Sequence, residues 1–384
     1  MQKQGPLRYL LYFLVLALLT LPEYYLPLLQ QAFPALQARV LGGSFERVDY
    51  PRFWPQKWLT GGYQDQFEKA RRNRSPIAPF AVRHRNQLLR DVFGDSGAPR
   101  VVYGENDYFY AIEYCQAFAG MDYIGRAAIE AKVQQLQRIQ ELLGPQGPKL
   151  LVLLPPGKPR VLPENLPPFY RERRADSTNW QVFSDLLEGS GVPFMNFDFL
   201  IRKKEAFPYP IYPQFGLHWN YYGATVAADS MRQKIGQLLG KELPAMDYQQ
   251  AIPLRDSLMG TDKELLYGAN IQREPPARPM PYPVIKYRQD SLTHLPKALI
   301  VGDSYYKIWY DYGIQAGLFH PESSFWYYYG TIYPPQGGQH AQSLPILEET
   351  RRRDIILLPH AEINLNNFGF GYLDRLEGAL REGG

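Results

Sequence analysis

Short, continuous apolar runs alternate with longer amphipathic stretches from about residue 100 to the end of the chain. Such runs are typical of strands that are buried on both faces of a sheet. They predict strands at Arg100–Gly104, Lys149–Leu154, Val192–Phe197, Ala298–Val301 and Asp354–Pro359.

The stretches between these strands have apolar residues at helical spacing and end in glycine or proline. They predict helices at 123–143, 179–189, 221–240 and 372–381. Strands that alternate with helices indicate an α/β fold with a mainly parallel sheet flanked by helices. A proline-rich insert from about residue 241 to 295 interrupts the alternation, and we expect it to be irregular.

The first 30 residues differ in kind from the rest. Lys3 and Arg8 precede the apolar run Tyr9–Leu21, and aromatic residues follow at Tyr24 and Tyr25. The run is short for a full membrane span of roughly 17–25 residues, so a cleaved signal peptide competes with an uncleaved anchor. No small-x-small cleavage site follows promptly, which favours a transmembrane signal anchor at residues 1–30. The positive-inside rule then places everything after it outside the cytoplasm.

The remaining chain divides by composition at about residue 75. Residues 31–75 contain several glycines and prolines, with Trp54 and Trp58 between them. We expect an irregular approach segment, partly packed on the domain, and a single large α/β domain from 76 to 384 that includes the insert.

Composition excludes several classes of protein. The 384 residues are 45% hydrophobic and carry a net charge of +4 without a long basic run, which argues against a nucleic-acid surface. The single Cys115 excludes an internal disulfide. No ligand spacing for a metal and no phosphate-binding glycine loop is found, so no cofactor is predicted. The 29 tyrosines suit either stacking on a sugar or ordinary packing.

The candidate chemistry begins at Gly302-Asp303-Ser304, directly after the predicted strand 298–301. Open α/β sheets present catalytic groups at the carboxyl ends of their strands, so Ser304 is the candidate nucleophile. A serine hydroxyl attacks poorly until a base takes its proton, and His218 in Leu217-His218-Trp219-Asn220 is the best candidate base. The alternative for Ser304 is a helix cap.

Three other residues near these motifs are interpreted as structural. His360 closes another strand and could be a rival base, but strand-end histidines are more often hydrogen-bonded structural residues. Asp303 is expected to accept backbone N–H bonds within its turn. Trp219 is expected to hold the His218 loop in place.

The order of four motifs resembles a known family. Tyr103-Gly-Glu-Asn-Asp-Tyr-Phe-Tyr110, Leu154-Pro-Pro-Gly-Lys158, His218-Trp219-Asn220 and Gly302-Asp303-Ser304 follow one another. This set resembles the SGNH-hydrolase-like domain of bacterial polysaccharide O-acetyltransferases, the alginate acetylation proteins AlgJ and AlgX, over roughly residues 95–380. The resemblance implies an SGNH-hydrolase-like, flavodoxin-like sheet. In that family the histidine precedes the serine, as it does here.

The resemblance also implies an activity. Ser304 would take an acetyl group as an ester, and His218 would act as general base and then as acid. The acceptor would be a hydroxyl of a secreted exopolysaccharide, and a membrane-bound O-acyltransferase (MBOAT) would supply the acetyl group. The protein would be anchored in the bacterial inner membrane with its catalytic domain on the periplasmic side.

One position departs from the family pattern. The family has an aspartate two residues before the histidine, whereas this chain has Gly216. Loss of the orienting acid lowers kcat about 10⁴-fold in a triad enzyme. Asp198, Glu205 or Glu362 could substitute for it, a Ser-His dyad could suffice, or the protein could have lost catalysis.

Three residues are candidates for substrate binding. Lys158 follows a strand at a position where the family has a polar residue, and Trp326 and Tyr328 lie in the aromatic run Phe325–Tyr329. The alternatives are a solvated lysine and core packing of the aromatics. At the level of function, the alternatives are a non-catalytic glycan-binding or scaffold subunit and a carbohydrate acetylesterase.

Overall fold

The computed structural model describes residues 10–15, 28, 31–32, 41–43, 49–74, 78–249, 252–288 and 293–383. The chain forms two compact units, one from Met1–Val101 with Leu266–Pro275 and the other from Val102–Leu265 with Pro276–Gly384. Most of the expected anchor at residues 1–30 lies outside the described residues. Within the described part, no helix combines the length and apolar character that a membrane span needs.

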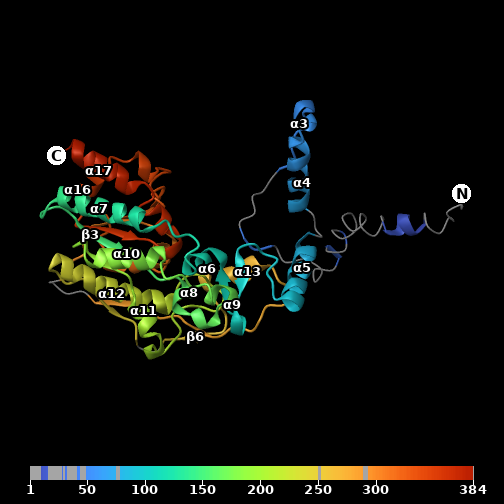
Figure 1. The fold of residues 1–384 in the computed structure, drawn as a ribbon, viewed down its shortest axis with the longest axis horizontal. Coiled ribbons are helices and arrows are strands. Elements are labelled where there is room, and N and C mark those ends of the chain that lie inside the picture. Colours follow the sequence, from blue (N-terminus) through green and yellow to red (C-terminus); the bar gives the residue numbers. More distant parts are fainter. Residues whose placement is uncertain are drawn as a thin grey trace. The chain divides into compact units, whose positions relative to one another are not determined.

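A six-stranded sheet forms the centre of the second unit (Figure 1). Its order is β11 (Thr331–Tyr333), β10 (Ser324–Tyr327), β9 (Ala298–Gly302), β12 (Ile355–Pro359), β3 (Lys149–Leu153) and β4 (Phe194–Met195). All neighbours are parallel except β10 and β11, which pair antiparallel at one edge. The expected α/β fold with a mainly parallel sheet is therefore confirmed.

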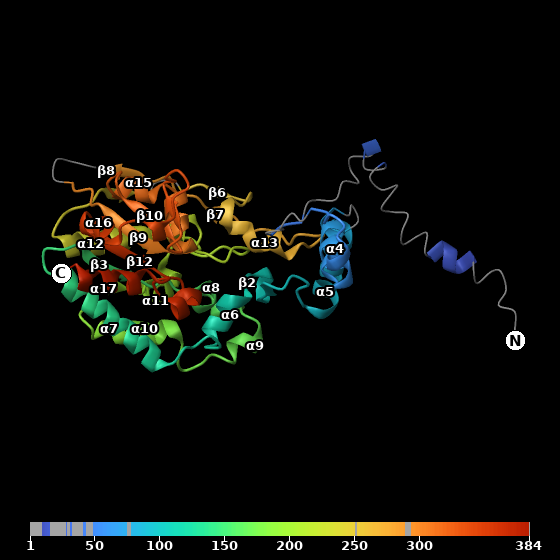
Figure 2. The same ribbon diagram turned by 90° about the horizontal axis from the view of Figure 1, so that it is seen from above.

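Helices cover both faces of this sheet. The long ones are α7 (Arg126–Leu143), α10 (Asn179–Glu188), α12 (Tyr221–Leu239), α14 (Ser304–Asp311) and α17 (Tyr372–Glu382). Shorter ones are α6 (Ile112–Phe118), α8 (Lys158–Val161), α9 (Pro168–Arg171), α11 (Phe199–Arg202), α15 (Ile314–Leu318) and α16 (Ile346–Arg351). Figure 2 shows α7 and α10 on the opposite side of the sheet from α15.

The core on the α7 side follows from the alternation of side chains along the strands. Val152 of β3, Val301 of β9 and Leu358 of β12 point to this face and pack with Ile139 of α7 and Leu376 of α17. All five are at most 3% exposed. Because both faces of the sheet are covered, the strands read as continuous apolar runs in the sequence.

The structure departs from the expected elements at the strand 192–197 and in the insert. The strand expected at 192–197 is reduced to the two residues of β4. The insert at 241–295 is not irregular throughout, because it contains β5 (Ala245–Asp247), β6 (Leu254–Arg255), α13 (Glu264–Ala269), β7 (Met280–Pro281) and β8 (Lys286–Arg288). The strands pair as two small antiparallel ribbons, β5 with β8 and β6 with β7.

The first unit is mainly helical. It contains α3 (Pro55–Leu59), α4 (Gly62–Arg74) and α5 (Ala78–Phe93), so the described part of residues 31–75 is more regular than expected. Polar side chains of α5 hold the segment after α13: Arg83 donates to the Ile271 carbonyl at 3.0 Å, and Asn86 donates to the Ala269 carbonyl at 2.9 Å. The first β-ribbon of the chain, β1 (Val101–Tyr103) with β2 (Phe109–Ala111), follows.

Candidate active site

Ser304 lies at the carboxyl end of the central strand β9, as the first residue of α14. The chain turns sharply there because Gly302 carries no side chain. A Cβ at this position would lie 2.4 Å from the Cγ of Pro359 on the neighbouring strand β12. The turn leaves Ser304 partly exposed while its neighbours on both sides are buried.

Asp303 is the residue that shapes this turn. Its side chain caps α14 by accepting from the Tyr305 N–H at 3.0 Å. Its other oxygen accepts from the Ala361 N–H and the Asn364 side chain, both at 2.7 Å. Burial raises the pKa of Asp303, and these hydrogen bonds act against the rise. The carboxyl group is fully used by these contacts, in keeping with the structural role expected for it.

His218 lies directly beside Ser304. Its Nε2 atom is 2.8 Å from the Ser304 Oγ, although 86 positions separate the two residues. The ring is 5% exposed and packs against the ring of Tyr305, with centroids 5.0 Å apart. The geometry is that of a hydroxyl nucleophile and its general base.

Glu264 occupies the other side of the imidazole ring. Its Oε1 atom lies 2.9 Å from His218 Nδ1 and also accepts from the Leu217 N–H at 3.0 Å. Burial raises the pKa of Glu264, but the charge of His218 and the hydrogen bonds from His218 and Leu217 outweigh it, so this pKa lies below its usual value. An ionised Glu264 accepts a hydrogen bond from Nδ1–H, so the lone pair of the His218 ring is on Nε2, which faces the serine hydroxyl.

Gly216 explains why the acid comes from position 264. A Cβ at Gly216 would lie 2.4 Å from the Thr261 carbonyl oxygen and 3.2 Å from the Cα of Asp262. The backbone of the insert therefore fills the space where the family pattern has an aspartate side chain. Two residues further on, at the start of α13, the insert presents Glu264 to His218.

The loop that carries His218 is held on both sides. Asn220 caps α12 by accepting from the Gly223 N–H at 2.8 Å and donates to the Pro210 carbonyl at 2.7 Å. Trp219 is 1% exposed and stacks on Trp309, with centroids 4.9 Å apart. Its position agrees with the expectation that it holds the His218 loop in place and does not contact substrate.

Lys158 also supports this loop. Its ammonium group donates to the carbonyl oxygens of Phe109, Gln214 and Gly216 at 2.6, 2.9 and 3.0 Å. The side chain is 1% exposed, so it does not reach solvent or a polysaccharide, and its interpretation as a substrate-binding residue is corrected. Burial holds the pKa of Lys158 well below its usual value, whereas the three carbonyl oxygens favour the ammonium form.

The three acids that the sequence suggested for His218 lie elsewhere. Asp198 pairs with Arg202 one turn along α11. Glu362 is 2% exposed and accepts from Arg160 at 2.6 Å and from the Gly157 N–H at 2.9 Å, so its carboxylate is fully occupied in a buried ion pair. Glu205 is exposed. Sequence reasoning missed Glu264, whose only local sign was an acidic residue beginning a short helix in the insert.

Two further expectations are changed by burial. Trp326 is completely buried in the core, so it does not stack on a glycan. The rival base His360 is also completely buried, its Nε2 accepts from the Gly369 N–H at 2.9 Å, and burial lowers its pKa to about 4. It serves as a structural acceptor, as the sequence suggested.

Tyr328, in contrast, lies beside the nucleophile and is 39% exposed. Burial raises its pKa and the charge of Asp303 adds to the rise, while hydrogen bonding with Asn364 and Ser304 acts against it. Its backbone has a φ of +50°, unusual for a bulky residue, and its N–H donates to the Gly302 carbonyl at 2.8 Å. Tyr328 therefore lies at the carboxyl end of β9, next to the turn that carries Ser304.

Tyr114 contributes a second hydroxyl to this region. The residue is 2% exposed, and its Oη has no hydrogen-bond partner among the described residues. Burial raises its pKa well above 10, and the nearby Asp303, Tyr328 and Glu264 add to the rise. Its ring lies 6.2 Å from the ring of Tyr305, the residue after Ser304, so Tyr114 offers an unused, neutral donor beside the start of α14.

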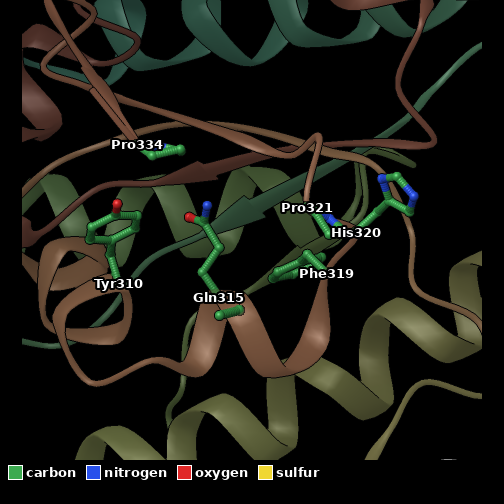
Figure 3. A pocket seen from close by; sticks show the side chains of 7 residues that line it. Tyr310, Gln315, Phe319, His320, Pro321 and Pro334 are labelled. Atoms are coloured by element: carbon green, nitrogen blue, oxygen red, sulfur yellow. The ribbon is translucent and has the colours of Figure 1, made fainter. Parts of the chain in front are cut away.

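The chemistry is separate from a surface pocket at the far end of α14. Tyr310, Gln315, Phe319, His320 and Pro334 line this pocket, with Ala316 and Pro321 (Figure 3). Ser304, His218 and Glu264 do not line it. Within the described ranges, no group of three or more His, Cys, Asp or Glu side chains is placed to hold a metal ion.

Comparisons with known proteins point to one family. Residues 101–313 match the model of the AlgX SGNH hydrolase-like acetyltransferase domain. Among solved structures, the O-acetyltransferase domain of Pseudomonas putida AlgJ is 14% identical, with a TM-score of 0.46, over 73% of this chain and 99% of that one. Pseudomonas aeruginosa AlgX is 13% identical, with a TM-score of 0.48, over 71% and 67%.

A sulfonyl adduct of Bacillus cereus PatB1 is also similar, at 13% identity and a TM-score of 0.39 over 65% of this chain and 93% of that one. No curated protein matches the chain.

Proposed function

Because the chain belongs to the family of AlgX-type SGNH hydrolase-like acetyltransferase domains, we propose that it transfers acetyl groups to hydroxyls of a secreted polysaccharide through an ester on Ser304. The observation that carries the proposal is the bridge that His218 makes between Ser304 and Glu264, at 2.8 and 2.9 Å. The arrangement supports acyl transfer because it supplies a nucleophile, a base and an acid that holds the base in one tautomer.

In the first half-reaction, His218 Nε2 takes the proton from Ser304 Oγ as this oxygen attacks the acetyl carbonyl carbon. The tetrahedral intermediate collapses to acetyl-Ser304, and His218 returns the proton to the departing oxygen or sulfur of the donor. Glu264 stabilises the imidazolium that forms between these two steps.

The intermediate carries a negative oxygen that requires hydrogen-bond donors. The Ser304 N–H at the start of α14 is one donor. We assign the second to the Tyr114 hydroxyl, which is buried and has no other partner in the described part of the chain. Its raised pKa keeps it protonated, so it can donate.

In the second half-reaction, a sugar hydroxyl enters where the donor left. His218 takes its proton, the sugar oxygen attacks acetyl-Ser304, and the proton returns to Ser304 Oγ. Water in place of the sugar would give the acetylesterase reaction with the same residues, so the acceptor decides between the two outcomes.

The assembly around this reaction follows from the family resemblance. The domain would act on the extracytoplasmic side, with residues 1–30 as a single anchor in a bacterial inner membrane. A membrane-bound O-acyltransferase would supply the acetyl group. Gly216 favours a non-catalytic scaffold in the sequence, because the family has an acid at this position. Glu264 offers His218 an acid from another position, 2.9 Å away, and this supports the catalytic proposal.

The test is acetyl transfer from a chromogenic acetyl ester in the presence and absence of oligosaccharide acceptors. The wild-type protein should form an acetyl-enzyme visible by intact mass, and acceptors should gain the acetyl group. Ser304→Ala and His218→Ala should abolish both. An acetyl-enzyme that only water discharges, with every acceptor tried, would make the protein an esterase. Absence of an acetyl-enzyme would overturn acyl transfer by this domain.

A further inference from the structure

An exposed aromatic surface lies in the first unit, apart from the residues used for acyl transfer. The aromatic arm, residues 50–67, consists of an extended segment followed by α3 and the first half of α4 (Figure 1). Phe53, Trp54, Trp58 and Leu59 are 61, 59, 49 and 78% exposed. Contiguous exposed apolar surface of this kind marks a site of interaction.

The arm has almost no core of its own. No residue of α3 is buried, and Ala70 is the only buried residue among positions 49–71. The rings that contact one another do so at the surface: Tyr50 packs on Phe67 at 5.4 Å and Phe53 on Tyr63 at 5.5 Å between centroids. Packing within the arm therefore orders the rings without removing them from water.

The composition of the arm identifies what covers it. Trp and Tyr are the residues that prefer the boundary between acyl chains and headgroups, because their rings are apolar and their N–H and O–H groups stay hydrated. The arm itself carries Arg52 and Lys57 against Asp65, and the second half of α4 adds four more Lys and Arg residues against Glu68. Basic side chains near an anionic bilayer are attracted to its negatively charged surface.

The position of the arm in the sequence agrees with this choice. The apolar run Tyr9–Leu21 and the pair Tyr24-Tyr25 precede it. The chain thus returns to aromatic, basic composition shortly after its most apolar stretch.

We propose that the aromatic arm is a membrane-interface surface, in which Trp54 and Trp58 insert at the headgroup level of a bilayer containing anionic lipid. Trp54 is the N-cap of α3, and the backbone N–H of Trp58 donates to its carbonyl at 3.0 Å, so the two residues lie one helical turn apart, and both side chains are exposed. The arm lies on the bilayer rather than spanning it. The proposal is independent of the acetyl-transfer reaction.

The chain contains an internal reporter for this contact. Its six tryptophans are Trp54, Trp58 and the buried Trp180, Trp219, Trp309 and Trp326, the last four at most 7% exposed. None precedes Trp54, so the predicted anchor contributes no indole emission. Quenching of tryptophan fluorescence by lipids brominated on their acyl chains therefore reports on the arm alone.

The experiment uses full-length protein reconstituted in phosphatidylcholine–phosphatidylglycerol vesicles with and without brominated lipid. We expect brominated lipid to remove most of the emission that Trp54 and Trp58 contribute. The double variant Trp54→Phe/Trp58→Phe should show less than a tenth of that loss. Its acetyl-ester hydrolysis should stay within twofold of wild type, which separates this proposal from the proposed activity.

A matched control places an equally exposed indole elsewhere. Phe169 of α9 is 49% exposed, the same as Trp58. Phe169→Trp in the double-variant background should remain unquenched. Equal quenching at position 169, or no quenching of the wild-type protein, would overturn the proposal. Unquenched indoles whose emission shifts to the blue only when another membrane protein is added would assign the arm to a protein partner instead.

Discussion

Glu264 Oε1 lies 2.9 Å from His218 Nδ1, although 46 positions separate the two residues. The same oxygen accepts from the Leu217 N–H, so the acid holds both the ring and its backbone. Glu264 thus supplies the acid that is missing from the sequence next to His218.

Glu264→Gln should therefore lower kcat/KM for acetyl-ester hydrolysis by about 10²–10⁴-fold, because the amide no longer stabilises the imidazolium. Glu264→Asp should retain part of the activity. The control is Glu205→Gln, an exposed acid away from His218, which should stay within twofold of wild type. A loss below twofold in Glu264→Gln would exclude a triad role.

Restoring the family aspartate should not rescue the enzyme. Gly216→Asp places a Cβ 2.4 Å from the Thr261 carbonyl oxygen, so the insert must shift. We expect a destabilisation of about 1–3 kcal/mol in urea unfolding, as for other overpacked sites. Gly216→Asp/Glu264→Ala should remain as inactive as Glu264→Ala. Gly189→Ala is the control, since a Cβ there meets nothing within 4 Å. Recovery of activity in the double variant would contradict the steric argument.

Tyr114→Phe tests the second oxyanion donor. Removal of one such donor costs about 10²–10³-fold in kcat, and KM should change little because the hydroxyl acts on the transition state. Tyr306→Phe is a close control: its hydroxyl is also buried without a partner among the described residues, but burial alone raises its pKa. Equal effects of the two substitutions on kcat would assign Tyr114 to packing.

Lys158→Met tests the clamp on the His218 loop. The substitution keeps most of the buried volume but removes the ammonium donor from the carbonyl oxygens of Phe109, Gln214 and Gly216, of which Gln214 keeps the Phe109 N–H. We expect a loss of more than about 2 kcal/mol in unfolding free energy. In the folded fraction, kcat should fall more than KM rises, because His218 loses its position. Lys158→Arg, which keeps the charge, should not restore kcat, since the site is too closely packed for the guanidinium.

Asp262 predicts a pH-dependent stability. Burial raises its pKa to about 7, with Glu264 adding to the rise and Tyr282 opposing it. The folded protein thus binds a proton that the unfolded chain releases above its ordinary pKa of 3.8. The contribution is fully present below pH 4 and is lost as the pH rises through about 7.

Asp262→Asn should therefore be more stable than wild type at pH 8, and the difference should shrink by up to about 1.4 kcal/mol per pH unit as the pH falls toward 5. Urea unfolding at several pH values measures this. A constant difference between the two proteins across that range would show that Asp262 does not titrate on unfolding.

The sequence by itself determined the central strands β3, β9 and β12, the helices α7, α10, α12 and α17, and the candidate serine and histidine. Apolar runs such as Ala298–Val301 are local patterns, and the carboxyl end of a parallel strand is a predictable place for Ser304. His218 could be predicted as the base because the order of its motif and the serine motif resembles one family. The distances between these residues could not be predicted, since they depend on how the strands and helices pack.

Only the tertiary structure decided which acid faces His218 and which candidates are buried. Glu264 comes from an insert that joins the site through backbone packed on Gly216, and no local pattern records such a contact. Lys158 and Trp326 had the residue types of a glycan site, yet both are enclosed by the fold. Trp54 and Trp58 lie in a segment that was expected to be partly packed, and the structure shows that both side chains are exposed. Residue type and spacing determine local conformation, whereas the burial of a side chain and its hydrogen-bond partners depend on distant segments that the fold brings together.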